Sequence, residues 1–237
     1  GPAETATNAG APGGIIGLIG YAVGSAAPLL AFVFIGGRLR RLMPEGHSLT
    51  EYVWYRFGGT MYVLTLIVMI FYMFVFLGAE LTGIALAVHA IAGTPLVSTV
   101  VVVGVATLAY TAYGGLRATI FTDAVQFALI PPLLLMAFIG GVVLMGGFGE
   151  ITQDVTAAAP KVLSFSHSLG WETGIALVIA VMAANMFHQG YWQRVYSCRD
   201  ESTLRRSFVL AAVLVVPIVL IAGFFGVMAV GAGVAEN

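Results

Sequence analysis

Asp123 carries the most evident chemistry in this chain, because it is a carboxylate at the entrance to a long apolar run. Thr119, Asp123 and Gln126 are spaced i, i+4 and i+7, so they share one face of a helix. An isolated charge at the centre of a bilayer costs at least about 2.5 kcal/mol, so such an acid must be paired, hydrated or neutral. Two interpretations stay open: a path for an ion or solute, or an acid that reaches back to water at the interface.

A second polar stripe lies further along the chain. Its members are Asn185, His188, Gln189 and Gln193. Such side chains either bond neighbouring helices or line a hydrated path, and two stripes favour a path. The apolar run before this stripe, residues 174–184, is about half the 20 residues that a straight span needs. We therefore predict an irregular or broken helix near residues 185–190, with Asn185 and Gln189 facing the protein interior.

Other chemistry is sparse. Glu80 interrupts another apolar run, where it either meets a cationic group or a proton or extends outward to water. The four histidines, His47, His89, His167 and His188, show no metal-ligand spacing. The chain also has no phosphate loop, nucleophile elbow or paired catalytic carboxylates. The sequence therefore predicts a protein that is not an enzyme, and it leaves open whether residues of this chain ligate a metal ion.

The composition indicates an integral membrane protein. Apolar residues make up 59% of the chain and charged residues 9%, whereas soluble domains are about one quarter charged. The formal net charge of −1 gives no sign of nucleic-acid binding. Cys198 is the only cysteine, so no disulfide can form within the chain.

The distribution of apolar runs predicts an all-α chain with six transmembrane helices in one domain over residues 1–237. The expected spans are 13–37, 58–92, 96–112, 116–146, 173–189 and 207–230.

Basic residues set the expected orientation, because cytoplasmic loops carry an excess of arginine and lysine. Nine of the ten basic residues fall on alternate connections, and Lys161 is the exception. The nine are Arg38, Arg40, Arg41, Arg56, Arg117, Arg194, Arg199, Arg205 and Arg206. We expect these connections on the cytoplasmic side of the cell membrane and both ends of the segment outside the cell.

Three segments resemble the signatures of the sodium:solute symporter family. Residues 113–126 read Tyr-Gly-Gly-Leu-Arg-Ala-Thr-Ile-Phe-Thr-Asp-Ala-Val-Gln, similar to the family's Gly-Gly-Leu…Thr-Asp…Gln. Residues 188–194, His-Gln-Gly-Tyr-Trp-Gln-Arg, followed by Cys-Arg-Asp at 198–200, resemble its Gln-x-x-x-Gln-Arg…Ala-Arg-Asp segment. Residues 49–58 resemble its Glu-Tyr…Arg-Phe-Gly helix entry. The nearest branch by these segments is that of urea active transporters, which share the Tyr-Trp-Gln-Arg form and a Pro-x-x-His segment like residues 44–47.

The resemblance implies a LeuT-type fold of two inverted repeats that works by alternating access. The expected spans would be core helices two to seven, so the chain looks incomplete: the first and eighth core helices, which share the main sodium site, have no counterpart. Sodium would be the coupling ion, with no other cofactor. Asp123, with Thr119 and Gln126, would lie in the cation path. Asn185, His188, Gln189, Gln193 and Glu80 would form the substrate site or inner gate.

The resemblance implies sodium-coupled symport of a small polar solute, urea-like in the nearest branch, with the lipid bilayer as the other partner. Asn185 and His188 stand where family members often have Trp and Asn, which argues against a sugar-type site. Two alternatives remain. The chain could be the transporter-like sensor module of a membrane histidine kinase, or it could form a passive solute channel.

Overall fold

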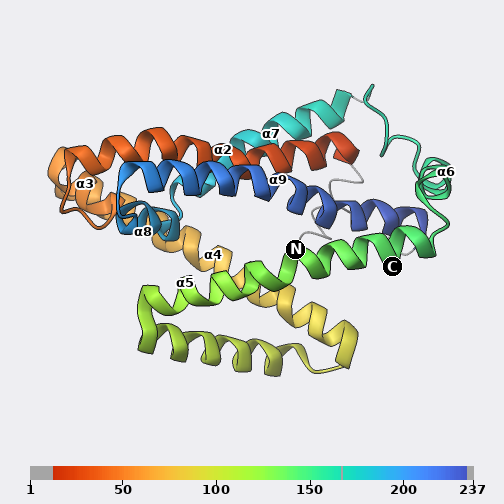
Figure 1. Ribbon diagram of the computed structural model, residues 1–237, viewed down its shortest axis with the longest axis horizontal. Helices are drawn as coiled ribbons and strands as arrows, with labels where there is room; N and C mark the ends of the chain where they lie inside the picture. The colour runs from red at the N-terminus through yellow and green to blue at the C-terminus, as the bar shows by residue number, and fades with distance from the viewer. Residues whose placement is uncertain (1–12, 167, 234–237) are drawn as a thin grey trace. The chain divides into compact units, whose positions relative to one another are not determined.

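The computed structural model describes residues 13–166 and 168–233. His167 lies outside them. Within these ranges the chain is all-α, with eight helices and no strand. The helices are α2 (Gly14–Leu42), α3 (Leu49–Phe57), α4 (Gly59–Ala92), α5 (Leu96–Leu144), α6 (Phe148–Ala158), α7 (Ser168–Met186), α8 (Gln189–Ser197) and α9 (Glu201–Gly231) (Figure 1).

Five of the described helices are long and apolar enough to cross a membrane: α2, α4, α5, α7 and α9. The sequence predicts six spans, and the difference lies in α5. This helix has 49 residues, which at about 1.5 Å per residue is more than twice the roughly 30 Å hydrocarbon core. Gly115 interrupts it with φ 54° and ψ −145°, a conformation that glycine adopts readily because it has no Cβ. The interruption falls between the two expected spans 96–112 and 116–146.

The chain divides into a smaller unit, residues 74–139, and a larger unit made of residues before 74 and after 139. In the smaller unit, the end of α4 turns into the start of α5 through Gly93, Thr94 and Pro95. Gly93 has φ 65°, and a ring nitrogen of His89 lies 2.7 Å from the Thr94 carbonyl oxygen. The two helices face each other where Ala85 of α4 and Val97 of α5 line a common hollow.

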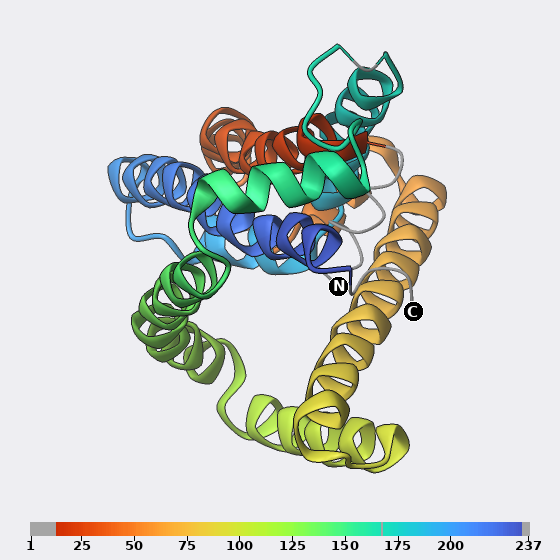
Figure 2. The ribbon, with the colours of Figure 1, turned by 90° about the vertical axis from the view of Figure 1, so that its right-hand side faces the viewer.

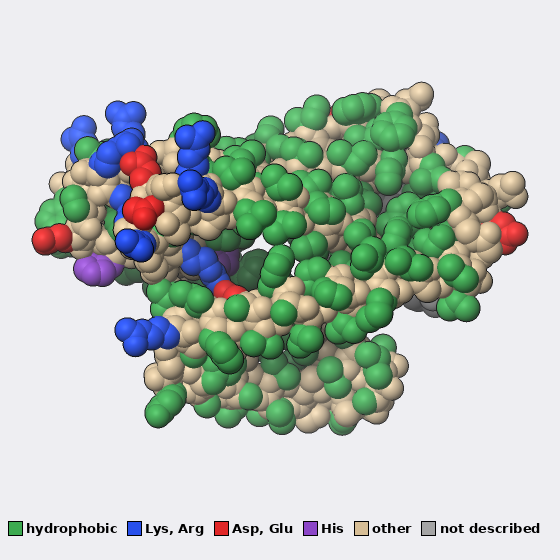
Figure 3. Space-filling view, in the orientation of Figure 1, with side chains coloured by type: hydrophobic (Ala, Val, Ile, Leu, Met, Phe, Trp, Pro, Cys, Tyr) green, Lys and Arg blue, Asp and Glu red, His purple; other side chains and the backbone are tan. Residues whose placement is uncertain are grey.

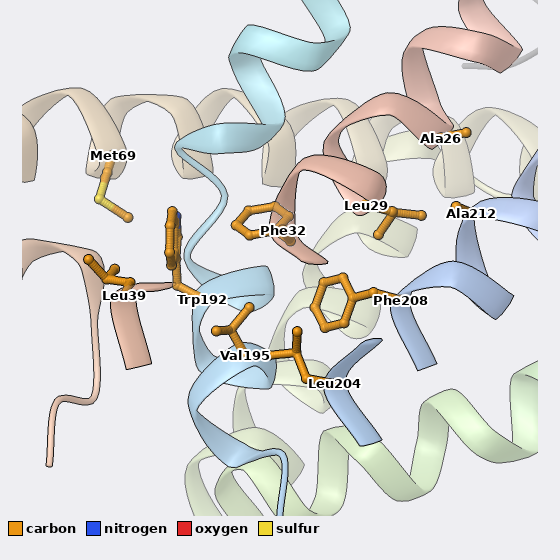
Figure 4. Close-up of a cluster of buried hydrophobic side chains, with 10 residues drawn as sticks. All are labelled: Ala26, Leu29, Phe32, Leu39, Met69, Trp192, Val195, Leu204, Phe208 and Ala212. Atoms are coloured by element: carbon orange, nitrogen blue, oxygen red, sulfur yellow. The ribbon is translucent and has the colours of Figure 1, made fainter. Parts of the chain in front are cut away.

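In the larger unit, α2 packs against α7, α8 and α9, and α6 packs against α9 (Figure 2). The centre of this packing is Phe32 of α2, which is fully buried. Its ring meets Trp192 of α8 edge-on at a centroid distance of 4.9 Å and Phe208 of α9 at 5.8 Å (Figure 4). Aromatic pairs of this geometry add about 0.5–1.5 kcal/mol each beyond the area they bury.

Glycines let α2 and α7 meet backbone to backbone. Gly20 and Gly24 are four residues apart on α2, the small-xxx-small spacing that permits close helix approach in membranes. A methyl group at Gly24 would lie 3.0 Å from the Leu177 carbonyl oxygen, and one at Gly20 would overlap the backbone of Gly174. Gly174 in turn sits against Ile16, so neither helix has room for a side chain at these positions.

The two ends of the larger unit differ in chemistry. At one end the Ile15 amide donates to the Val162 carbonyl at 2.7 Å, and Gly231 at the end of α9 packs on Val155 of α6. At the other end arginines gather around α8 and the adjoining ends of α2 and α9, and Figure 3 shows them grouped there. The start of α2 and the end of α9 therefore lie at the same end of this unit, away from the arginines.

Candidate functional site

The helix break predicted near residues 185–190 is confirmed. Helix α7 ends at Met186, Phe187 forms a turn, and α8 begins at Gln189. The Phe187 amide donates to Ala184 O at 3.0 Å and the His188 amide to Asn185 O at 3.1 Å, so the last turn of α7 tightens before the chain leaves the helix. His188 itself is extended, with φ −77° and ψ 105°.

His188 organises the start of α8. Its Nδ1 accepts the Gly190 amide at 3.1 Å, which makes it the N-terminal cap of that helix. Because Nδ1 is the acceptor, this is the neutral tautomer that carries its proton on Nε2. Two tyrosine rings flank the imidazole, Tyr191 at a centroid distance of 4.8 Å and Tyr72 at 6.1 Å. The break is therefore lined by an aromatic cluster around the His188 imidazole.

The amide side chains of the stripe take different positions. Asn185 is half-buried and its Nδ2 donates to the Val181 carbonyl at 2.8 Å. Gln189 is also half-buried, and its Oε1 is fully buried with no hydrogen-bond partner among the described residues. Gln193, one turn further on, is exposed. The structure thus gathers Asn185, His188 and Gln189 at the break and leaves Gln193 at its outer edge.

Two residues at the break were not singled out from the sequence. The Trp192 indole Nε1–H donates to the Met186 carbonyl at 2.8 Å, satisfying a backbone acceptor that the end of α7 exposes. Arg194 Nη1 donates to the Gly190 carbonyl at 3.3 Å. Both lie in the motif at 188–194, but nothing in that motif shows which backbone group each side chain reaches.

The first stripe lies on α5 in the smaller unit. Thr119 is half-buried, and its hydroxyl donates to the Leu116 carbonyl at 2.9 Å just after the Gly115 interruption. Asp123 and Gln126 are exposed on the same helix, and Glu80 is exposed on α4. The structure therefore places oxygen-bearing side chains on one segment of α5. Their role in a cation path remains a prediction.

The architecture so far is that of a multi-pass helical membrane protein in which the apolar helix α7 ends at a polar, aromatic junction with α8. Solute transporters use interrupted helices for their binding sites. The chain belongs to the sodium:solute symporter family, whose pattern it matches over residues 7–235. It therefore belongs to a family of transporters and is not an enzyme.

Individual relatives carry different solutes. The chain is 30% identical over 220 residues to the spermidine transporter DUR31 of Candida albicans, covering 93% of this chain and 41% of that protein. It is 28% identical to the sodium/glucose cotransporter of Vibrio parahaemolyticus, covering 74% of this chain and 35% of the relative. It is 23% identical to the probable urea active transporter 1 of Schizosaccharomyces pombe, covering 81% of this chain and 31% of that protein. The chain spans about two fifths or less of the length of these relatives.

Proposed function

We propose that this chain forms part of a transporter that couples the movement of a small polar solute to sodium by alternating access. The observation that carries the proposal is the break between α7 and α8, where the buried Gln189 Oε1 has no partner among the described residues. In transporters, broken helices of this kind supply backbone and side-chain groups to a solute near the middle of the membrane. Membership of the symporter family supports sodium as the coupling ion.

The groups at the break favour a solute that donates hydrogen bonds. Gln189 Oε1 is a buried acceptor that needs an N–H or O–H group, and the His188 ring with Tyr191 and Tyr72 forms the aromatic part of the lining. Asn185 lies on the same segment, and Gln193 and Glu80 are the remaining predicted members of the substrate site or inner gate. Urea, amides and amines offer the complementary groups, and relatives named for urea and spermidine support this range.

Sodium would follow the stripe on α5. Sodium binds oxygen atoms, and the Asp123 carboxylate, the Thr119 hydroxyl and the Gln126 amide oxygen share one face of that helix. The Asp123 charge would attract the cation, and the neutral oxygens would replace part of its hydration shell. The proposed fold around this path is six spans, core helices two to seven of the inverted-repeat transporter architecture. Both ends of the segment would lie outside the cell.

Uptake by the full-length transporter in sealed proteoliposomes tests the function, with a panel of urea, amides and polyamines and with or without an inward sodium gradient. We expect accumulation only with the gradient. Asp123→Asn should weaken the dependence on sodium while leaving protein yield unchanged, because the amide keeps the volume and removes the charge. Asp154→Asn, at an exposed aspartate of α6, is the matched control and should behave as the wild type.

The same measurements would also reveal an error in the proposal. Equilibration of solute at equal rates with and without sodium would indicate a passive channel. Sodium activation that is unchanged in Asp123→Asn would remove Asp123 from the cation path. Orientation is tested separately by Ala157→Cys and Ser202→Cys in a Cys198→Ala background, where an impermeant maleimide added to intact cells should label only position 157.

A further inference from the structure

An open hollow of about 390 Å³ lies at the arginine-rich end of the larger unit. It is lined by Gly37, Arg40, Arg41, Pro44 and Glu201. The Arg41 guanidinium donates to both carboxylate oxygens of Glu201, at 2.8 and 3.0 Å, so these two charges neutralise each other. Arg40 is different: its Nη1 is buried and has no hydrogen-bond partner among the described residues. The hollow therefore has one guanidinium whose charge its wall does not balance.

A second unsatisfied donor lies near Arg40. The hydroxyl of Tyr196, on α8, is buried and also has no partner among the described residues. A methyl group at Gly46 would lie 3.2 Å from the Tyr196 ring, so Tyr196 lies beside the turn that carries Pro44 of the wall. Burial and the Glu51 carboxylate raise the pKa of this phenol, and the Arg40 guanidinium acts in the opposite sense. Glu51 is engaged elsewhere: one of its oxygens accepts the His47 amide at 2.7 Å and the other lies 3.8 Å from the His47 ring.

Two buried donors, one of them charged, need an acceptor. A buried group left without its hydrogen bond costs about 1–3 kcal/mol, and more when it carries charge. Guanidinium groups pair most strongly with carboxylate and phosphate oxygens. The hollow is more than ten times the roughly 30 Å³ share of one water molecule, so it has room for a polyatomic anion. It lies where the chain leaves the apolar spans, and basic pockets at that depth on the cytoplasmic side suit phosphate headgroups.

We propose that this hollow is a binding site for a phosphate group, in which Arg40 and Tyr196 donate hydrogen bonds to the phosphate oxygens. The Arg41–Glu201 pair forms the opposite wall and joins the end of α2 to the start of α9. The ligand is either the phosphodiester of an anionic lipid or free phosphate, since the two offer the same oxygens. Such a site would tie the stability of the contact between α2, α8 and α9 to its occupancy.

Thermal-shift titrations of the purified protein in an uncharged detergent test the proposal. One series adds short-chain phosphatidylglycerol, and the other adds inorganic phosphate. Arg40→Gln should weaken binding about tenfold or more, because a charge-assisted hydrogen bond is lost. Tyr196→Phe, which removes only the hydroxyl, should weaken it severalfold. Arg38→Gln is the matched control, since Arg38 is on the same helix but exposed and outside the hollow, and it should bind as the wild type.

Each outcome either identifies the source of the phosphate group or shows that the proposed site is wrong. A response to phosphatidylglycerol alone identifies a lipid headgroup, and a response to both ligands identifies a site for free phosphate as well. No saturable response to either ligand would mean that water fills the hollow, and the proposal would be wrong. Equal losses in Arg40→Gln and Arg38→Gln would show only diffuse attraction to the basic surface. If Arg40→Gln does not fold, wild-type affinity in Tyr196→Phe would still refute the geometry.

Discussion

Replacing Gln189 with methionine should make the protein more stable and a poorer transporter. Methionine has a similar length and volume but lacks the amide. Its thioether therefore fills the same space without leaving a buried oxygen unpaired. An unsatisfied buried acceptor costs about 1–3 kcal/mol, so Gln189→Met should recover up to that amount of unfolding free energy. Stability and activity change in opposite directions only if the amide is retained for its ligand.

Two measurements on the same preparation follow the two effects. The midpoint of thermal unfolding in detergent should rise in Gln189→Met. The KM for solute uptake should rise about two- to tenfold, the equivalent of one lost hydrogen bond of about 0.5–1.5 kcal/mol. Gln193→Met is the matched control one turn along α8. Because Gln193 is exposed, its replacement should change stability by less than about 0.5 kcal/mol.

The reasoning would be refuted by a variant that is less stable than the wild type. That result would show that Gln189 Oε1 is already bonded within the protein and is not held ready for a solute. A more stable variant with unchanged uptake would show that Gln189 does not contact the solute, and the solute site would then lie elsewhere.

Three further predictions concern other parts of the structure. Gly20→Ala should destabilise the protein by about 1–3 kcal/mol, because the added methyl meets the Gly174 backbone, whereas Gly83→Ala on α4, with open space around it, should be neutral or stabilising in the same thermal assay. The Asp200 side chain caps α9 through the Thr203 amide at 2.7 Å, and this bond holds the carboxyl pKa below its ordinary value. The stabilisation by this cap is therefore present above the ordinary aspartate pKa, and it is lost as the pH falls through the lowered pKa of Asp200. Asp200→Asn should weaken this dependence of the melting temperature on acid pH. An unchanged pH profile in Asp200→Asn would contradict the prediction. Burial raises the pKa of the Cys198 thiol, so maleimide labelling at neutral pH should be slower than for an exposed cysteine and should quicken as the pH rises; labelling as fast as that of a free thiol would contradict the burial.

The sequence predicts the broken helix well because the signal is local. The continuous apolar run before Asn185 covers only residues 174–184, and α7 ends two residues later at Met186, where the polar residues begin. The same local logic predicts most helices. Local patterns do not predict which hydrogen bonds form at the break. The bond from the Trp192 indole to the Met186 carbonyl depends on how α8 packs against the end of α7.

Longer-range relations are harder to predict from one sequence. The Gly20–Gly24 spacing is visible in the chain, but only the packing shows that it faces Gly174 of α7, more than a hundred residues away. The sequence predicts two spans, 96–112 and 116–146, but only the structure shows that α5 departs from a helix at Gly115 between them.

The close contact between α2 and α7 has a mechanical consequence. Where Gly20 and Gly24 of α2 meet the backbone of α7, a sliding or rolling motion of one helix over the other would cause atoms to clash. We therefore expect α2 and α7 to move together as one rigid pair. The chain runs from α7 into α8 through the two non-helical residues Phe187 and His188, and Trp192 of α8 packs on Phe32 of α2. A change in the bonds of His188 or Gln189 would then act on the start of α8 and, through Trp192, on its contact with α2.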